Sequence, residues 1–451
     1  MVQLALLLLG MQAVQRHWRT LTAIGAGWIL LGLIVAIDPL DGVQDITMHT
    51  LGAFLVIEGA VIAATALLTE WRGRLWIAQA AALIIPGLLI IETPWRNFVL
   101  ISVLFGIALV ADGSVRILST LLVRFPGWRF ALVASGLEFV LAVLAFTPWP
   151  VSYQATVPFC VGIALLLAGW TVLRSASMLR RLPPDAPITA LPIFRQRRGW
   201  LIPPALPAPT PPTTEKGEAC MIVHVWTPVG SAPVSARRPL IDRYIAAVDH
   251  HGTVSTGHAA LEMPPDLYIS HYRASDEDRN QQEFRRALNA GPQNDMPGRF
   301  LPNYTYEVAS WCEATEHVVF RRFSAERLRS FWESYRQNST YNLTNRNCSV
   351  VVALALDVAL EGVLGRETVW TPLGRLLLHP DLYLATLLRK RAQTMTWTPG
   401  LVLDYARALQ RVLEPPGISW PGLIRQTFAR YRDIRRRYPE SEEAPQQKTA
   451  A

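Results

Sequence analysis

Cys348 is the residue best placed to do covalent chemistry. It follows Asn347 and stands just before residues 350–360, a short run that is almost wholly apolar. A helix that is apolar on all sides must be buried, and this one is too short to cross a bilayer. The unpaired N–H groups and the dipole at its N-terminus favour a thiolate at Cys348. The pattern predicts a nucleophile whose own backbone N–H serves as an oxyanion donor.

His258 is the candidate general base for this nucleophile. It lies in a Gly-His-Ala stretch inside a strand-like segment, 252–263, where small neighbours leave room for a facing side chain. The next strand-like segment, 267–272, carries His271. A hairpin would place His271 beside His258, where it could hydrogen-bond the imidazole and fix its tautomer. Cys348, His258 and His271 therefore form the predicted catalytic set.

Other assignments for the same residues stay open. A cysteine beside an apolar helix is often an inert core thiol, and a strand histidine can simply sit half exposed. Glu262 is a rival for the orienting role of His271, but it shares a strand with His258. Ser270 and Tyr268 alternate with His271 and are expected on the other face of their strand. Cys312 is expected in a core.

These residues lie in an α+β half of the chain, with strands first and one buried helix last. Ser324 is the expected N-cap of a further helix that runs through Tyr335. Segment 236–248 has a weak helical pattern. The expected strands, besides 252–263 and 267–272, are 221–226, 304–312 and 317–323.

The N-terminal half is dominated by apolar runs that predict six membrane spans. The spans are 21–37, 50–69, 76–91, 98–120, 130–146 and 156–172. They form three helix-pair repeats with a period of about 55 residues. Each repeat shares three landmarks: a tryptophan at the start (Trp18, Trp76, Trp128), then a proline (Pro39, Pro94, Pro148) and a late glycine (Gly59, Gly113, Gly169). The expected architecture is an all-α six-helix transmembrane bundle.

Charge places both termini on one side of the membrane. The chain has a net charge of +8, with 51% hydrophobic and 17% charged residues. Arginines precede the first span, follow the sixth and lie between spans two and three and spans four and five, so the positive-inside rule puts both termini in the cytoplasm. Asp112 is expected to pair with Arg116 one helical turn on.

Composition also excludes several kinds of site. The four cysteines lack metal-ligand or disulfide spacing, so neither a metal nor a cofactor is expected, and free thiols suit a reducing compartment. No RNA-binding motif or aromatic-interleaved basic stripe appears, so nucleic acid is not an expected partner. The expected partners are the lipid bilayer and a peptide, protein or acyl-lipid substrate; homo-oligomer formation is left open.

The remaining segments connect or extend these two parts. Residues 4–9 are apolar and are interpreted as an interfacial segment, because no cleavage site follows. Residues 182–219 form a proline-rich spacer, and 366–438 a helical extension. Within the extension, 373–388 either presents a solvated face or lies on the anionic leaflet with its basic residues toward head groups. Residues 439–451 are expected to be disordered.

The N-terminal part, about residues 15–181, resembles the HdeD-like family of six-helix membrane proteins, first associated with bacterial acid resistance. The Asp112-Gly113 turn of the second repeat matches the family pattern. The first repeat has Glu58-Gly59, whereas the third has Ala168-Gly169 and lacks the acid. With this resemblance the domain boundaries are 1–181 and a soluble domain from 220.

The soluble part, 220–365, resembles circularly permuted papain-like hydrolases, the superfamily of NlpC-like peptidases and lecithin:retinol acyltransferases. The resemblance rests on three motifs: Gly257 to Leu261, Tyr268 to Tyr272, and Tyr341 to Ser349. In permuted members the histidine precedes the cysteine, as His258 precedes Cys348. In the acyltransferase branch a second histidine follows the first, which maps onto His271. The resemblance implies amide, ester or thioester chemistry.

The sequence therefore predicts a thiol hydrolase held at the cytoplasmic face of a bacterial inner membrane. The favoured reaction is cleavage of a peptide or isopeptide amide through a thioester acyl-enzyme. One alternative is a lipid acyltransferase or acyl hydrolase. The other is a non-catalytic stress or scaffold protein.

Overall fold

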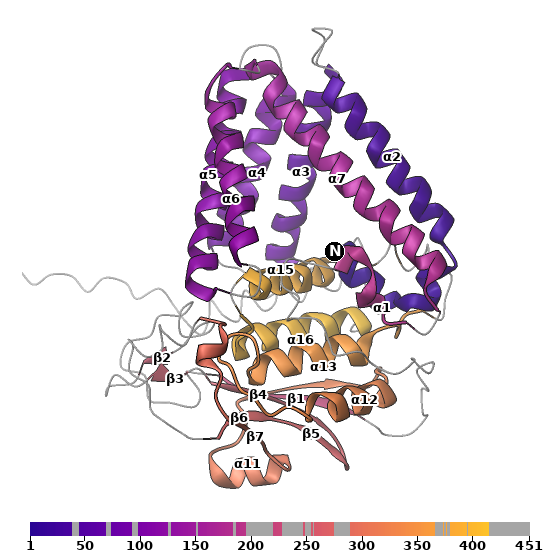
Figure 1. Ribbon diagram of the computed structural model, residues 1–451, viewed down its shortest axis with the longest axis vertical. Helices are drawn as coiled ribbons and strands as arrows, with labels where there is room; N and C mark the ends of the chain where they lie inside the picture. Colours follow the sequence, from indigo (N-terminus) through magenta and orange to yellow (C-terminus); the bar gives the residue numbers. More distant parts are fainter. Residues whose placement is uncertain are drawn as a thin grey trace, which may run out of the picture.

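The computed structural model describes most of the chain, namely residues 1–37, 45–68, 74–92, 98–124, 128–149, 152–183, 186–194, 220–227, 247–248, 254–255, 257–274, 289–365, 373, 376, 379–394 and 396–414. Long apolar helices lie at one end and a small sheet with its covering helices lies at the other (Figure 1). Helix α15 (Pro380–Thr394) lies between these two parts (Figure 1).

A long helix occupies each position where a membrane span is predicted. These helices are α2 (Trp18–Ile37), α3 (Asp45–Leu68), α4 (Arg74–Glu92), α5 (Phe98–Val123), α6 (Trp128–Phe146) and α7 (Tyr153–Arg181). Within the described residues four segments, in α2, α5, α6 and α7, are long and apolar enough to cross a membrane. Large apolar side chains face outward from them, with Leu118 70% and Phe130 72% exposed. A soluble protein would bury such side chains, so this part is that of a membrane protein.

The long helices pack between the sequence repeats. Helix α3 packs on α4, α5 packs on α6, and α7 closes onto α2 (Figure 1). Glycines permit the close approach of α2 and α7, because a Cβ added at Gly32 would lie 2.9 Å from the carbonyl oxygen of Gly162 and one at Gly169 would lie 2.8 Å from that of Gly25. Small residues at such spacing are the usual means of close helix packing in membranes.

The predicted pairing of Asp112 with Arg116 is confirmed. The two side chains are 2.6 Å apart within α5, and Arg116 also lies 3.1 Å from Glu138 of α6. The charges of this group are thus partly compensated inside the helix layer.

Helix α1 (Val2–Gln15) corrects the prediction of an interfacial segment. Residues 4–9 are at most 4% exposed and belong to the core of the sheet-containing part. The N–H groups of Gly362 and Leu364 each donate a 2.9 Å hydrogen bond to α1, to the carbonyls of Leu7 and Leu8. Apolar composition alone does not distinguish burial in protein from burial in lipid.

The sheet has four antiparallel strands in the order β5-β4-β1-β8. They are β1 (Met221–Trp226), β4 (His258–Met263), β5 (Leu267–Ile269) and β8 (Glu316–Phe320). Helices α13 (Cys348–Leu360) and α16 (Pro399–Leu413) lie on the side of the sheet that faces the long helices, and α11 (Tyr304–Ser310) lies on the other side (Figure 1). Two short pairs accompany the sheet: β2 (Ala247–Val248) with β3 (Val254–Ser255), and β6 (His271–Arg273) with β7 (Gly298–Phe300).

The predicted strand at 304–312 is wrong, because residues Tyr304–Ser310 form α11. The side chain of Asn303 accepts a hydrogen bond from the Tyr306 N–H and caps this helix. A capping asparagine therefore outweighs the strand-like aromatic and β-branched residues that follow it. The Ser324 cap of α12 (Ala325–Tyr335) is confirmed, since its side chain accepts from the Arg327 N–H.

The C-terminal helices belong to the core of the sheet-containing part. Helix α16 packs against β1, β4, β8 and α13. In α15, Arg389 lies 2.6 Å from Asp357 of α13, and Tyr405 of α16 donates a 2.6 Å hydrogen bond to the same carboxylate. Arg389 thus faces the protein, so neither of the two alternatives left open for the extension, a solvated face or a place toward lipid head groups, describes this residue. Within the predicted spacer 182–219, Ile188 and Leu191 are fully buried in the same core. The rest of that spacer from residue 195 on, segment 236–246 and the tail 439–451 lie outside the described residues.

Candidate active site

Cys348 is the first residue of α13, the apolar helix predicted from the sequence. The side chain of Asn347 caps the helix by accepting a 2.8 Å hydrogen bond from the Val350 N–H. Every residue of α13 is buried, so packing holds the cysteine firmly at the helix start. The Cys348 N–H has no acceptor within the helix, because first-turn amides lack one. An N–H in this position is the kind of donor that an oxyanion needs.

His258 is the first residue of β4, and its imidazole lies beside the Cys348 thiol, close enough for each group to shift the pKa of the other. The register of β4 against β1 sets His258 opposite Trp226 at one end of the sheet. His258 is 3% exposed and Cys348 is 7% exposed. The structure thus brings the predicted nucleophile and the predicted base side by side.

Glu307 lies near the Nε2 atom of the His258 imidazole. Its Oε1 lies 3.3 Å from His258 Nε2, and the same nitrogen lies 2.9 Å from the Ser270 hydroxyl. Ser270 donates its own proton to Glu307 Oε2 at 2.9 Å, so the hydroxyl oxygen must accept from His258 Nε2–H. With Nε2 protonated in this network, Nδ1 is the nitrogen that can take the thiol proton.

Two tyrosines complete the surroundings of the buried carboxylate. Tyr268 donates to Glu307 Oε2 at 2.6 Å, and Tyr272 donates to Oε1 at 2.9 Å. Burial and the charge of Glu307 raise the pKa of both phenols, so both stay protonated as donors. Glu307 is 1% exposed, and hydrogen bonds of this kind are what a buried carboxylate needs.

Two aromatic rings pack against the His258 imidazole and restrict its rotation. The Tyr272 ring stacks on His258 with centroids 4.0 Å apart, and the Trp226 ring lies 5.5 Å away. This packing leaves the ring few orientations other than the one that joins Cys348 to Glu307.

Electrostatics favour a thiolate–imidazolium pair. Burial by itself would raise the pKa of the Cys348 thiol, but the charge and hydrogen bond of His258, with smaller contributions from Ser349 and Ala259, bring it below its usual value. Burial likewise opposes protonation of His258, yet the Cys348 thiolate and Glu307 together raise its pKa. A low thiol pKa beside a histidine is the hallmark of a reactive cysteine.

His271 does not take the orienting position predicted for it. Its Nδ1 lies 3.1 Å from the Tyr335 hydroxyl and its Nε2 lies 3.1 Å from the carbonyl oxygen of Ser339, so both nitrogens have other partners. Burial lowers the pKa of His271 to about 4, which keeps it neutral. The predicted hydrogen bond from His271 to His258 is therefore replaced by the one through Ser270 and Glu307.

The position predicted for His271 is wrong because of the register between the two strands. Leu261 pairs with Ile269 and Glu262 pairs with Tyr268, and extending this register places Tyr272 beside His258. A shift of one residue moves a side chain to the other face of a sheet, so Ser270 and Tyr272 share the face of His258 while His271 lies on the opposite one. The sequence pattern does not reveal Glu307, because 304–312 predicts a strand whereas Glu307 reaches His258 from α11.

The rival orienter Glu262 has a different partner. It accepts from His224 Nε2 at 2.9 Å, and His224 Nδ1 lies 2.9 Å from His317 Nδ1.

Within the described residues no group of three or more histidine, cysteine or acidic side chains is arranged to hold a metal ion. Comparisons with protein-family models, with curated proteins and with solved structures found no match to this chain.

Proposed function

We propose that this chain is a membrane-anchored thiol hydrolase that cleaves a peptide or isopeptide amide through a thioester at Cys348. The observation that carries the proposal is the buried array in which His258 lies beside the Cys348 thiol and 3.3 Å from Glu307. A nucleophile, a base and an acid that orients the base are the parts of a catalytic triad. Glu307 takes the orienting role in this proposal, and His271 becomes a structural residue.

The reaction follows from this arrangement. The Cys348 thiolate attacks the carbonyl carbon while its helix-start N–H stabilises the oxyanion. His258 then donates its proton to the leaving amine, and a thioester forms. Water attacks the thioester with His258 as base, the thiolate leaves, and the carboxylic acid is released. An amine leaves only when it is protonated, and the imidazolium that Cys348 and Glu307 favour supplies that proton.

An acyl lipid is the second candidate substrate, and one contact favours it. Residues 341–347 lead into Cys348, and among them Asn345 donates from its side-chain nitrogen to the carbonyl of Ala290 at 2.9 Å. The Ala290 N–H in turn donates to the carbonyl of Val123, the last residue of α5, at 2.6 Å. Segment 341–347 is thus linked through Ala290 to the end of α5, a helix long enough to span a membrane.

The resemblances to HdeD-like proteins and to permuted papain-like hydrolases stay part of this proposal, as does placement at the cytoplasmic face of a bacterial inner membrane. The sheet-containing part lies at the end of the helices where α7 finishes with Arg180 and Arg181 (Figure 1). Cytoplasmic loops carry such an excess of arginine. Protease digestion of right-side-out and inverted vesicles tests the side: cleavage of the sheet-containing part is expected only in inverted vesicles.

Trapping of the acyl-enzyme tests the reaction class. Purified protein would be incubated either with amide-containing peptides or with phospholipid vesicles, then analysed by intact mass before and after hydroxylamine. The proposal expects a hydroxylamine-sensitive adduct from the peptides that is absent in Cys348→Ala and retained in Cys312→Ala. An adduct from phospholipid alone would select the lipid candidate. No adduct with either, together with an ordinary thiol pKa, would leave a non-catalytic binding or scaffold role.

A further inference from the structure

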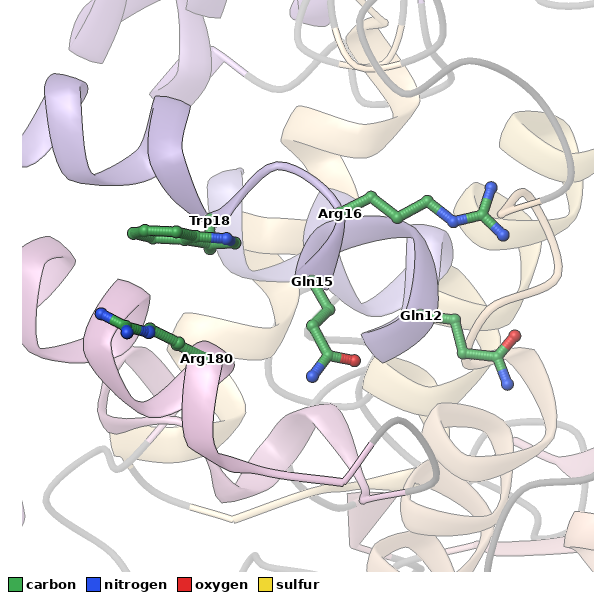
Figure 2. A pocket seen from close by; sticks show the side chains of 5 residues that line it. All are labelled: Gln12, Gln15, Arg16, Trp18 and Arg180. Carbon is green, nitrogen blue, oxygen red and sulfur yellow. The ribbon is translucent and has the colours of Figure 1, made fainter.

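An open surface pocket, called the cavity below, lies where α1, α2 and α7 meet, away from the candidate active site, and is lined by glutamine and arginine side chains beside a tryptophan ring. It has a volume of about 470 Å³ and is lined by Gln12, Gln15, Arg16, Trp18 and Arg180 (Figure 2). The lining residues carry two positive charges and no negative charge. Such a cavity favours an anion.

The walls of the cavity are fixed by specific contacts. The Gln15 side-chain nitrogen donates to the carbonyls of Leu179 and Leu182, at 3.0 and 2.9 Å, which ties α1 to the end of α7. The guanidinium carbon of Arg180 lies 5.5 Å from the centroid of the Trp18 ring. This cation–π contact holds the Arg180 charge at the cavity without neutralising it.

The position of the cavity matches the level of lipid head groups. Trp18 begins α2, and Arg180 is in the last turn of α7, and both helices contain segments able to cross a membrane. Tryptophan and arginine at the ends of such helices lie in the interfacial layer. Basic pockets between membrane helices at that level suit phosphate-bearing head groups.

The two arginines flank the cavity and are not clustered. Figure 2 shows Trp18 and Arg180 on one side of Gln15 and Arg16 on the other side. A small inorganic ion would meet one guanidinium, whereas a head group with a phosphodiester and a polar alcohol could reach both arginines and the glutamine amides.

We propose that this cavity binds the phosphodiester head group of an anionic phospholipid such as phosphatidylglycerol. Arg180 binds the phosphate charge, and Arg16 and Gln12, on the other side of Gln15, bind the alcohol part. The lipid would also support α1, which is hydrogen-bonded through Leu7 and Leu8 to the segment just after α13. The proposal is independent of the chemistry at Cys348.

The test uses the full chain in phosphatidylcholine nanodiscs, with increasing phosphatidylglycerol or cardiolipin. Native mass spectrometry would report retained lipid, and thermal unfolding would report stabilisation. We expect retention of one anionic lipid and a rise in midpoint, both lost in Arg16→Gln/Arg180→Gln. The matched control is Arg124→Gln/Arg129→Gln, since both arginines lie over Trp128, at 5.9 and 5.7 Å, but do not line the cavity.

A charge-retaining variant and two soluble ligands complete the test. Arg180→Lys retains the charge and should retain anionic lipid even if the double variant is poorly folded. Inorganic phosphate and glycerol 3-phosphate, added to nanodiscs without anionic lipid, distinguish a soluble ligand from a head group. Equal retention of phosphatidylcholine and phosphatidylglycerol, equal loss in the control variant, or stabilisation by soluble phosphate alone would each overturn the proposal.

Discussion

Glu307 Oε1 lies 3.3 Å from His258 Nε2, with the carboxylate in α11 on one side and the imidazole at the start of β4 on the other. This contact joins the face of the sheet opposite α13 to the helix start that carries Cys348. It makes α11, a short helix, part of the catalytic arrangement that we propose.

Replacing Glu307 by glutamine should weaken the imidazolium. Because the Glu307 charge helps to raise the pKa of His258, we expect Glu307→Gln to lower that pKa. Thiol reactivity should fall about tenfold, the effect of losing one charged hydrogen bond worth about 1.5 kcal/mol. The rate of Cys348 alkylation as a function of pH measures both changes. Glu262→Gln is the control and should leave the profile unchanged, because Glu262 bonds His224. An unaltered profile in Glu307→Gln would exclude the orienting role.

The pH dependence of Cys348 reactivity should show two limbs. The Cys348 pKa is lowered, so the thiolate is lost only as pH falls through that lowered value; the His258 pKa is raised, so the imidazolium persists until pH rises through that raised value. The ion pair, and the stability that it adds, exist between these two values. Ultraviolet absorbance of the thiolate during titration reports the acid limb. In His258→Ala the thiolate should appear only near the usual thiol range.

His271 should matter for stability and not for reactivity. It is fully buried and bonded to Tyr335 and Ser339, so His271→Ala should cost about 1–3 kcal/mol of unfolding free energy through the polar groups left unpaired. The thermal midpoint should fall, while the alkylation rate of Cys348 per folded molecule stays near that of the wild type. A variant that folds normally but loses reactivity as His258→Ala does would restore His271 as a catalytic residue.

Gly10 should be sensitive to a single methyl group. Its φ is 77°, and a Cβ there would lie 2.5 Å from the Cα of Gly362. A left-handed conformation alone costs an L-residue about 1–2 kcal/mol. Because the clash with Gly362 adds to this strain, Gly10→Ala should lower the unfolding free energy by more than that amount, and the thermal midpoint should fall. Gly27→Ala is the control, because a Cβ at Gly27 meets nothing within 4 Å. Equal midpoints for the two variants would show that α1 does not depend on this contact.

The sequence was most informative where a pattern acts over a short distance. The apolar run after Cys348, the strand around His258 and the six long helices all follow from local periodicity. The partner of His258 could not be read in the same way, because it depends on strand register and on where α11 folds back. One residue of register separates His271 from Tyr272, and only the paired sheet settles which of them faces His258.

The membrane part shows the same limit. Its helices were predicted from hydropathy, but their packing depends on glycines that bring α7 against α2 from opposite ends of the repeat series. The burial of α1 was missed because its leucines suit lipid and protein equally. Both the packing of α7 on α2 and the burial of α1 depend on contacts between residues far apart in the sequence.

The most direct test of the central claim is labelling of the purified protein by a thiol-directed alkylating probe across pH. Wild type would be compared with Cys348→Ala, His258→Ala and Cys312→Ala, since the Cys312 pKa is raised, chiefly by burial, and its thiol should react slowly. We predict fast labelling near neutral pH that is lost in Cys348→Ala, slowed in His258→Ala and retained in Cys312→Ala. Slow labelling that rises only toward the ordinary thiol pKa of about 8.5, whatever stands at position 258, would contradict it.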